Sequence, residues 1–369
     1  MKILFDHQIF STQIYGGVSR YFYELMKNFE NDNEIEYELS LRYSNNLYLR
    51  GLRNVACKSF FEDFTFRGKY RILNFLNKKI SKKFISKGNY DIFHPTYYNP
   101  YFFNFLNNKP FVLTIHDMIQ EIFPENFSNK DKISEYKKIL ASKASKIIAV
   151  SQNTKNDIIK FYSIDEAKID VVYHGSFSPI TNDIRNENIK FKLPEKFILF
   201  VGNRGGYKNF TNFMKSVSLL LKNDQNLFVV CAGGGNFNKY EQDLLKNLSL
   251  QERVFQFSVD DEELWILYKN ALVFVFPSLY EGFGLPILEA FACKCPIVVS
   301  NSSCFPEIAG EAAEYFDPLS TESMKSSIEK VVYNNNIRME LIKRGINRVR
   351  GFSWQKTAEK TKEVYQSLV

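Results

Sequence analysis

The chain has 369 residues, more than a single hydrophobic core usually serves, so two domains are expected. Its five cysteines argue against a disulfide framework and stand at no zinc-like spacing, so no metal site is expected. The net charge of +7 lies mostly in residues 1–180, and no apolar run approaches the roughly 20 residues of a membrane-spanning helix.

The chain opens on a predicted strand, Ile3–Phe5, which meets Asp6 too early for a signal peptide. We therefore expect a cytoplasmic protein. Strands and helices then alternate, which predicts parallel sheets covered by helices on both sides. Gly16 and Gly17 precede a helical pattern and let a ligand approach the backbone at a helix start, although glycine pairs also form ordinary turns.

Residues 64–90 carry eight basic side chains and no acidic one. Within Lys69–Lys87, apolar residues recur at helical spacing and lysines fall largely on another face: Leu73, Leu76, Ile80 and Phe84 against Lys78, Lys79, Lys82 and Lys83. This helix can lie on an anionic membrane surface, or it can be a solvated helix packed on the sheet. The patch is confined to one helix without a nucleic-acid-binding module, so nucleic acid is not expected as a partner.

Each of the four histidines follows a predicted strand: His7, His94, His116 and His174. In open α/β sheets, ligands bind beyond the carboxyl ends of the strands. We assign His116, with Asp117, to direct contact with substrate, because an imidazole near neutrality can donate or accept a hydrogen bond. His94 is the next candidate, whereas His7 and His174 can serve as braces for loops.

Helical and strand periodicity fail between residues 175 and 194, which predicts an interdomain linker. The predicted domains are 1–178 and 195–350, joined by a linker at 179–194 and followed by a final helix at 351–369. A new strand, Phe197–Val201, opens the second domain. Arg204 and Lys208 follow it in a glycine-bearing loop and suit the clamping of a diphosphate.

A second loop-and-helix unit follows the apolar strand at 271–276. Gly282 and Gly284 open the loop, and the helix that follows turns its positive end and its backbone N–H groups toward one spot, which suits phosphate. Glu281 and Glu289 frame this loop, and carboxylates accept hydrogen bonds from sugar hydroxyls. Phosphate donors beside hydroxyl acceptors indicate a nucleotide sugar. No dinucleotide fingerprint or P-loop stands after any predicted strand, which argues against both classes.

The ordered motifs of the second half resemble retaining GT-B glycosyltransferases of family 4, which include bacterial lipopolysaccharide and capsule enzymes. The matching residues are Val201-Gly202, Lys208-Asn209, Gly233–Gly235, Pro277–Pro286, Glu289-Ala290, Pro296–Ser300, Pro306-Glu307, Gly310 and Phe316–Pro318. The first half matches more loosely, at Gly16-Gly17, His116-Asp117 and Val150-Ser151. Lys294 departs from the pattern, since family members commonly have glycine there.

The resemblance implies an α/β chain of two Rossmann-like, doubly wound parallel-sheet domains that face a central cleft, with the last helix crossing back to the first domain. The implied donor-binding residues are Gly17, Arg204, Lys208, Ser258, Val259, Glu281, Gly282, Phe283, Gly284, Leu285 and Glu289. Glu289 would bind the ribose, Glu281 the donor sugar and Ser258-Val259 the base. The catalytic group would be His116, Glu281, Arg204 and Lys208.

The function implied is retaining, metal-independent transfer of a hexose to a growing, lipid-linked bacterial glycan. The donor is a GDP- or UDP-linked sugar, and no cofactor is expected. Asp6–Arg20 and His94–Tyr98 resemble a branch assigned to O-antigen mannosyl transfer, which favours mannose. A GT-B nucleotide-sugar epimerase or phosphorylase, and a non-catalytic sugar-nucleotide-binding subunit, remain as alternatives. The protein would work in the cytoplasm, with the basic helix as its contact to the inner face of the membrane.

Overall fold

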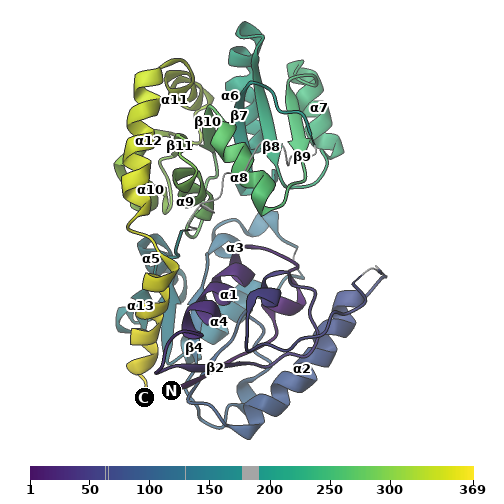
Figure 1. Cartoon of the computed structure of the whole chain (residues 1–369), viewed down its shortest axis with the longest axis vertical. Helices are drawn as coiled ribbons and strands as arrows, with labels where there is room; N and C mark the ends of the chain where they lie inside the picture. Colours follow the sequence, from purple (N-terminus) through teal and green to yellow (C-terminus); the bar gives the residue numbers. More distant parts are fainter. Residues whose placement is uncertain (63, 65, 129, 177–190) are drawn as a thin grey trace. The chain divides into compact units, whose positions relative to one another are not determined.

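The computed structural model describes residues 1–62, 64, 66–128, 130–176 and 191–369 (Figure 1). They form two compact units, one of Met1–Gly175 with Ser353–Val369 and the other of Ser176–Phe352. Residues 179–190 of the predicted linker lie outside the described residues.

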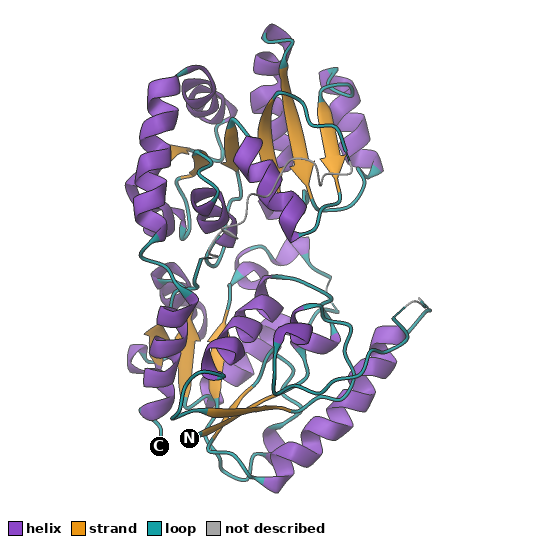
Figure 2. Ribbon diagram, viewed as in Figure 1, coloured by secondary structure: helices purple, strands orange, loops and turns teal. Residues whose placement is uncertain are grey.

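Unit 2 is built on one six-stranded parallel sheet, shown in orange in Figure 2. Its strands are β7 (Lys196–Val201), β8 (Leu227–Ala232), β9 (Val254–Phe257), β10 (Val273–Phe276), β11 (Ile297–Ser300) and β12 (Ala313–Phe316). The order is β12-β11-β10-β7-β8-β9. The chain runs outward from β7 to β9, returns to the other side of β7, and continues outward to β12. This doubly wound order puts a topological switch point between β7 and β10, where open α/β sheets bind ligands.

Helices cover the unit 2 sheet: α6 (Phe210–Asn223), α7 (Lys239–Leu248), α8 (Asp261–Asn270), α9 (Leu285–Ala292), α10 (Phe305–Ala309), α11 (Thr321–Tyr333) and α12 (Asn335–Val349). Helix α8 begins with a capping box, because the Asp260 carboxylate accepts from the N–H of Glu263 and the Glu263 carboxylate accepts from the N–H of Asp260. This box follows from the sequence spacing. The core between α6, α11 and the sheet contains Phe213, Met214 and Met324, all buried.

Unit 1 contains two three-stranded parallel sheets, β2-β1-β3 and β4-β5-β6. The strands are β1 (Lys2–Phe5), β2 (Glu36–Leu39), β3 (Ile92–His94), β4 (Val112–Ile115), β5 (Lys146–Ala149) and β6 (Ile169–Val171). A single parallel bridge between Phe93 and Phe111 joins β3 to the segment leading into β4. The predicted parallel α/β architecture is therefore confirmed in both units.

The helices of unit 1 are α1 (Gly17–Phe29), α2 (Lys69–Lys87), α3 (Ile119–Ile122), α4 (Ile133–Lys143), α5 (Gln152–Tyr162) and α13 (Trp354–Gln366). Helix α13 comes from the far end of the chain and packs on α1. Its Lys362 Nζ lies 2.7 Å from Asp32 Oδ2, and its Tyr365 hydroxyl lies 2.6 Å from His94 Nδ1. Within the described ranges, no helix has the length and apolar character to cross a membrane.

Candidate active site

The two loops that flank the switch point in unit 2 are joined directly. The N–H of Leu279, after β10, donates to the carbonyl of Tyr207, after β7, at 2.7 Å. Lys208 Nζ lies 2.5 Å from Glu281 Oε1, and the two side chains are 16% and 13% exposed. An ammonium and a carboxylate that are mostly shielded from water interact more strongly than a surface pair. The structure therefore brings the predicted Lys208 and Glu281 together.

The loop after β10 is held in place by the turn that follows β11. The N–H of Glu281 donates to Ser303 Oγ at 3.1 Å, and Ser303 Oγ donates to the carbonyl of Glu281 at 2.6 Å. Ser302 Oγ donates to the carbonyl of Leu279 at 2.9 Å. The backbone around Glu281 is thus fixed by hydroxyl groups before any ligand arrives, which is the preorganisation that a binding site needs.

Helix α9 begins directly after this loop. Gly284 has a φ of +86°, a left-handed conformation that glycine adopts without strain, and Pro286 occupies the first turn. The positive end of the helix and its first backbone N–H groups favour an anion here. Four residues therefore stand where phosphate is expected: Gly282, Phe283, Gly284 and Leu285.

Glu289 lies one turn further along α9 and meets a buried tyrosine. The Tyr268 hydroxyl donates to Glu289 Oε2 at 3.2 Å. Burial, and then the charge of Glu289, raise the pKa of Tyr268 well above its usual range, so its hydroxyl keeps its proton and stays a donor. Tyr268 orients the Glu289 carboxylate, and the sequence alone did not point to this partner.

Arg204 is not placed as the sequence predicted. Its guanidinium donates to the carbonyl of Gly233 at 2.9 Å and to that of Gly235 at 2.7 Å, and its Nε lies 3.1 Å from Glu241 Oε1. The side chain is only 1% exposed. We therefore replace the expected diphosphate clamp by a structural role, in which Arg204 holds the loop after β8 against the start of α7. In the sequence, the spacing Asn238-x-x-Glu241 is that of a capping box, and it could have indicated that the Glu241 carboxylate is held at the start of α7.

Ser258 and Val259 follow β9 at the same edge of the sheet. The N–H of Gly233 donates to the carbonyl of Phe257 at 3.0 Å, which ties the loop after β8 to the end of β9. Ser258 is exposed and Val259 is partly buried. The parallel register therefore gathers the predicted donor-binding residues of unit 2 beyond the carboxyl ends of its strands, in the loops after β7, β9 and β10 and on α9.

In unit 1, His116 follows β4 and its ring is neutral. Its Nε2 atom is buried and has no hydrogen-bond partner among the described residues. Burial, and then the charge of Lys137, lower the pKa of His116 to about 3, which favours the neutral ring at pH 7. The ring packs against Tyr21 at 5.2 Å and His174 at 5.8 Å between centroids. A neutral imidazole can still exchange hydrogen bonds with a substrate.

The other histidines of unit 1 are embedded in packing contacts. His94 lies between the hydroxyl of Tyr365 and Thr114 Oγ1, at 2.6 and 2.9 Å. Its side chain is fully buried. His94 was the second candidate for substrate contact, but in the structure it supports α13 instead. His7 Nδ1 lies 2.7 Å from Ser81 Oγ on α2. His174 packs on Trp354 at the start of α13.

Lys137 on α4 holds the loop that carries Asp117. The lysine is fully buried, and its Nζ lies 2.7 Å from Glu121 Oε2 and 3.1 Å from the carbonyl of Asp117. Sequence reasoning missed this residue because lysines of an amphipathic helix are usually solvated. Gly17 is the first residue of α1, and Gly16 before it has a φ of +154°. The predicted glycine-opened helix start is therefore present.

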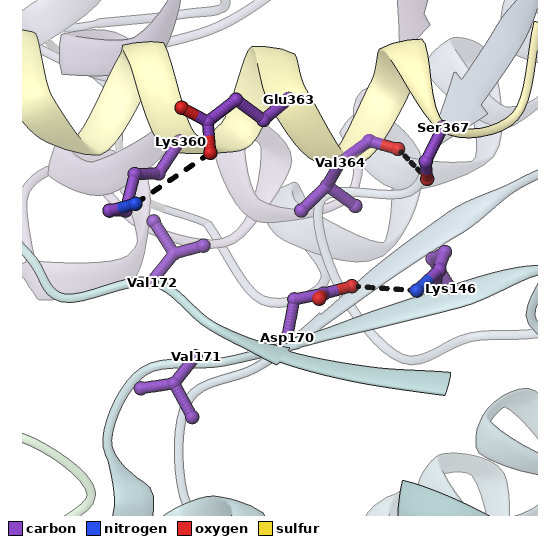
Figure 3. A pocket seen from close by; sticks show the side chains of 8 residues that line it. All are labelled: Lys146, Asp170, Val171, Val172, Lys360, Glu363, Val364 and Ser367. Carbon is purple, nitrogen blue, oxygen red and sulfur yellow. Dashed lines mark hydrogen bonds and ion pairs between the residues drawn. The ribbon is translucent and has the colours of Figure 1, made fainter. Parts of the chain in front are cut away.

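Two surface pockets are lined by residues other than Lys208 and Glu281. In unit 1, a pocket of about 190 Å³ lies between α13 and the strands β5 and β6, and its charges are paired with one another, Lys146 with Asp170 and Lys360 with Glu363 (Figure 3). In unit 2, a pocket of about 330 Å³ lies beside Arg204. Among the residues that the structure describes, no three His, Cys, Asp or Glu side chains are grouped as metal ligands.

Comparisons with known proteins agree with this geometry. Residues 15–176 match the family described as Glycosyltransferase Family 4, and residues 182–348 match Glycosyl transferases group 1. O-antigen chain mannosyltransferase RfbU of Salmonella typhimurium is 31% identical over 220 residues, which is 59% of this chain and 60% of that relative. O-antigen chain mannosyltransferase B of Escherichia coli is 27% identical over the full length of both chains.

A solved structure supports the fold. The Anabaena protein Alr3699/HepE, crystallised with UDP and glucose, superposes with a TM-score of 0.74 over 99% of each chain, at 16% identity. At that identity the likeness bears on the fold alone. Together, the two family matches span both units, and the sheet order and switch-point loops fit them. The chain belongs to the glycosyltransferases of the GT-B fold.

Proposed function

We propose that the protein is a retaining, metal-independent hexosyltransferase that uses a nucleotide-diphosphate sugar. The observation that carries the proposal is the Lys208–Glu281 pair at the switch point of unit 2, beside the amino end of α9. One cation, one carboxylate and a helix start supply the groups that phosphate and sugar hydroxyls need.

Charge separation at the glycosidic bond explains how these groups would act. As the bond breaks, the sugar becomes positive and the nucleoside diphosphate gains negative charge. Lys208 and the amides from Gly282 to Leu285 are proposed to stabilise the leaving group, with Gly17 as a second helix start for phosphate. Groups fixed in place before the reaction stabilise such developing charge without reorganisation. Because Lys208 and helix ends can provide this neutralisation, no step requires a metal ion.

The two glutamates have separate proposed roles. Glu289, oriented by Tyr268, binds the ribose hydroxyls, and Glu281 holds the sugar that is transferred. The base lies against Ser258 and Val259. We propose that the acceptor attacks from the face that the diphosphate leaves and that the departing phosphate takes the acceptor proton. Glu281 therefore does not become a covalent nucleophile, and His116 contacts substrate as a neutral imidazole.

The relatives guide the choice of sugar and acceptor. Two of them are named O-antigen chain mannosyltransferases, which supports mannose as the sugar and a bacterial surface glycan as the acceptor. We propose a GDP- or UDP-linked donor and a lipid-linked acceptor. The UDP and glucose of the Anabaena structure support a nucleotide-sugar donor in general. A lipid-linked acceptor would bring the protein to the inner face of the membrane, with residues 69–87 as its contact.

Donor binding and transfer can be measured separately. A panel of GDP- and UDP-linked sugars is screened for thermal stabilisation, since a ligand that binds only the folded state raises the melting temperature. The stabilising donor is then incubated with and without a lipid-linked glycan extract. Free nucleoside diphosphate that forms only with acceptor, together with a lengthened glycan, supports transfer. Release without acceptor indicates a hydrolase, and conversion of the donor into a different nucleotide sugar indicates an epimerase. Phosphate-dependent release indicates a phosphorylase, and binding without turnover a sugar-nucleotide-binding subunit.

A further inference from the structure

Helix α2 packs against unit 1 through polar contacts. Its buried residues recur every four positions: Lys69, Leu73, Asn77, Ser81 and Ile85. Asn77 Nδ2 donates to the carbonyl of Tyr43 at 2.7 Å, and Ser81 Oγ donates to the carbonyl of Ser40 at 2.6 Å. Of the apolar residues that recur at helical spacing, Leu73 is buried, whereas Leu76, Ile80 and Phe84 are only partly buried. Hydrogen bonds and the buried side chains of Leu73 and Ile85 attach the helix to the rest of unit 1. Its opposite face is exposed.

The outer face of α2 carries large apolar side chains near its amino end. Ile72 and Phe75 are exposed, and Phe75 is 55% exposed. The loop before the helix adds Phe61, Phe64 and Phe66, of which Phe64 is 70% exposed. We call these five residues the aromatic ridge: Phe61, Phe64, Phe66, Ile72 and Phe75. Figure 1 shows α2 lying along the outside of unit 1. A soluble protein rarely leaves such a cluster in water without a partner.

Cations continue the same face toward the carboxyl end of the helix. Lys79, Lys83 and Lys87 are exposed, as are Arg67 and Arg71 beside the aromatic ridge. Lys79 Nζ lies 4.4 Å from the ring centre of Phe75. The sequence from residue 64 to residue 90 contains eight basic residues and no acidic one. Two acidic residues, Glu62 and Asp63, come just before it, and Glu62 pairs with Arg50. The face is therefore both apolar and positively charged.

We infer that the aromatic ridge inserts into an anionic phospholipid bilayer while the lysines of α2 lie on its headgroups. A bilayer surface offers apolar depth and negative charge together, and aromatic side chains favour the boundary between the two. An acidic protein partner would satisfy the lysines but leave the five apolar side chains of the aromatic ridge unexplained. A second copy of this chain would bring the same positive charges together, which is unfavourable. The inference rests on the membrane association proposed above and identifies the residues that insert.

Vesicle flotation of the full chain tests the inference, with phosphatidylcholine vesicles alone or with about one third phosphatidylglycerol. The chain should float with the anionic vesicles and much less with the neutral ones. Lys79→Gln with Lys83→Gln should weaken binding about 30-fold, because each cation near the surface contributes about a fivefold factor. Phe64→Ser with Phe75→Ser should weaken it by about tenfold or more, since both rings leave water on insertion.

A matched control on unit 2 removes one exposed apolar and one exposed basic side chain. Leu319 is 76% exposed and Lys239 lies on the surface of α7. Leu319→Ser with Lys239→Gln should leave flotation unchanged. Donor-induced thermal stabilisation, measured on every variant, reports the site in unit 2 independently and should be the same in all of them.

Three results would overturn the inference. If the Phe64 and Phe75 double variant floats as well as the unaltered chain, the association holds but the aromatic ridge does not insert. If the unaltered chain floats with neither vesicle, the membrane association fails too, while the donor measurement still decides the transferase proposal. If the unaltered chain forms dimers that the double variant abolishes, and floats with neither vesicle, the partner of the ridge is a second copy.

Discussion

Lys208 Nζ lies 2.5 Å from Glu281 Oε1, although the two residues are 73 positions apart in the chain. Lys208 follows β7 and Glu281 follows β10, and these neighbouring strands flank the switch point of the unit 2 sheet. The two side chains therefore form an ion pair at the position proposed for the donor. A donor that brings a diphosphate to Lys208 and sugar hydroxyls to Glu281 would supply each with an additional partner.

Substitution of either partner should therefore abolish most of the transfer without unfolding the protein. Glu281→Gln and Lys208→Ala are each expected to lower the rate of nucleoside diphosphate release about 100- to 1000-fold, the usual loss for one electrostatic group of an active site. The double variant should be little worse than either single variant, because the two residues act as a unit. Lys239→Ala, which removes a surface ion pair with Asp243, is the control. Undiminished turnover in Glu281→Gln or Lys208→Ala would show that the substituted residue does not take part in transfer.

Arg204 should behave as a structural residue. Removing it leaves Glu241 buried without its cation and leaves the carbonyls of Gly233 and Gly235 without their donor. Loss of one partner of a buried pair costs about 3–5 kcal/mol. Arg204→Met should therefore lower the melting temperature by roughly 10 °C. Arg204→Met combined with Glu241→Leu should recover part of that loss, because no unpaired charge remains. If Arg204→Met keeps its melting temperature and loses donor-induced stabilisation, Arg204 contacts the diphosphate after all.

Local patterns predicted most elements of the fold, because their signals lie within one segment. Helix α2 spans Lys69–Lys87, the range suggested by its periodicity, and the capping box of α8 joins two residues, Asp260 and Glu263, that are only three positions apart. The four histidines lie at or just after strand ends. The sequence could not show which charges pair over long separations. Arg204 with Glu241 and Lys137 with Glu121 depend on how strands and helices pack, and a loop arginine or helix lysine is more often solvated.

Buried histidines should make the protein less stable as the pH falls below neutrality. Burial, and then the nearby His116, lower the pKa of His94 to about 3, against about 6.5 in the unfolded chain. Between these values the unfolded state binds a proton that the folded state excludes, so stability rises with pH across this window. His94 alone should cost about 2 kcal/mol between pH 7 and pH 5. The dependence is measured as the melting temperature at several pH values.

Two variants separate titration of His94 from its packing. His94→Gln removes one proton site and should reduce the loss of stability between pH 7 and pH 5 by the share of His94, about 2 kcal/mol, while the other buried histidines keep theirs. Tyr365→Phe removes the hydroxyl that lies 2.6 Å from His94 Nδ1 but keeps the imidazole buried. It should be less stable and retain the dependence. An unchanged slope in His94→Gln would show that other groups set the response to pH.

Gly175 is the position where unit 1 meets the start of its final helix, and a single methyl group there should displace α13. A Cβ added at Gly175 would lie 2.1 Å from the backbone nitrogen of Trp354 and 2.5 Å from the carbonyl carbon of Ser353. Backbone atoms cannot rotate away as a side chain can, so Gly175→Ala should cost about 3 kcal/mol or more. We expect a lower melting temperature and faster proteolysis within residues 354–366.

Gly205→Ala is the matched control, because a Cβ at Gly205 meets nothing within 4 Å and its φ is −87°. Its melting temperature should equal that of the unaltered chain. If Gly175→Ala is as stable as the unaltered chain, the backbone at Trp354 can move to make room for the methyl group without loss of stability, and α13 can shift along unit 1. If it is unstable but still gains stability from the donor, the attachment of α13 and the donor site of unit 2 are energetically separate. The terminal helix would then support the fold of unit 1 without contributing to donor binding.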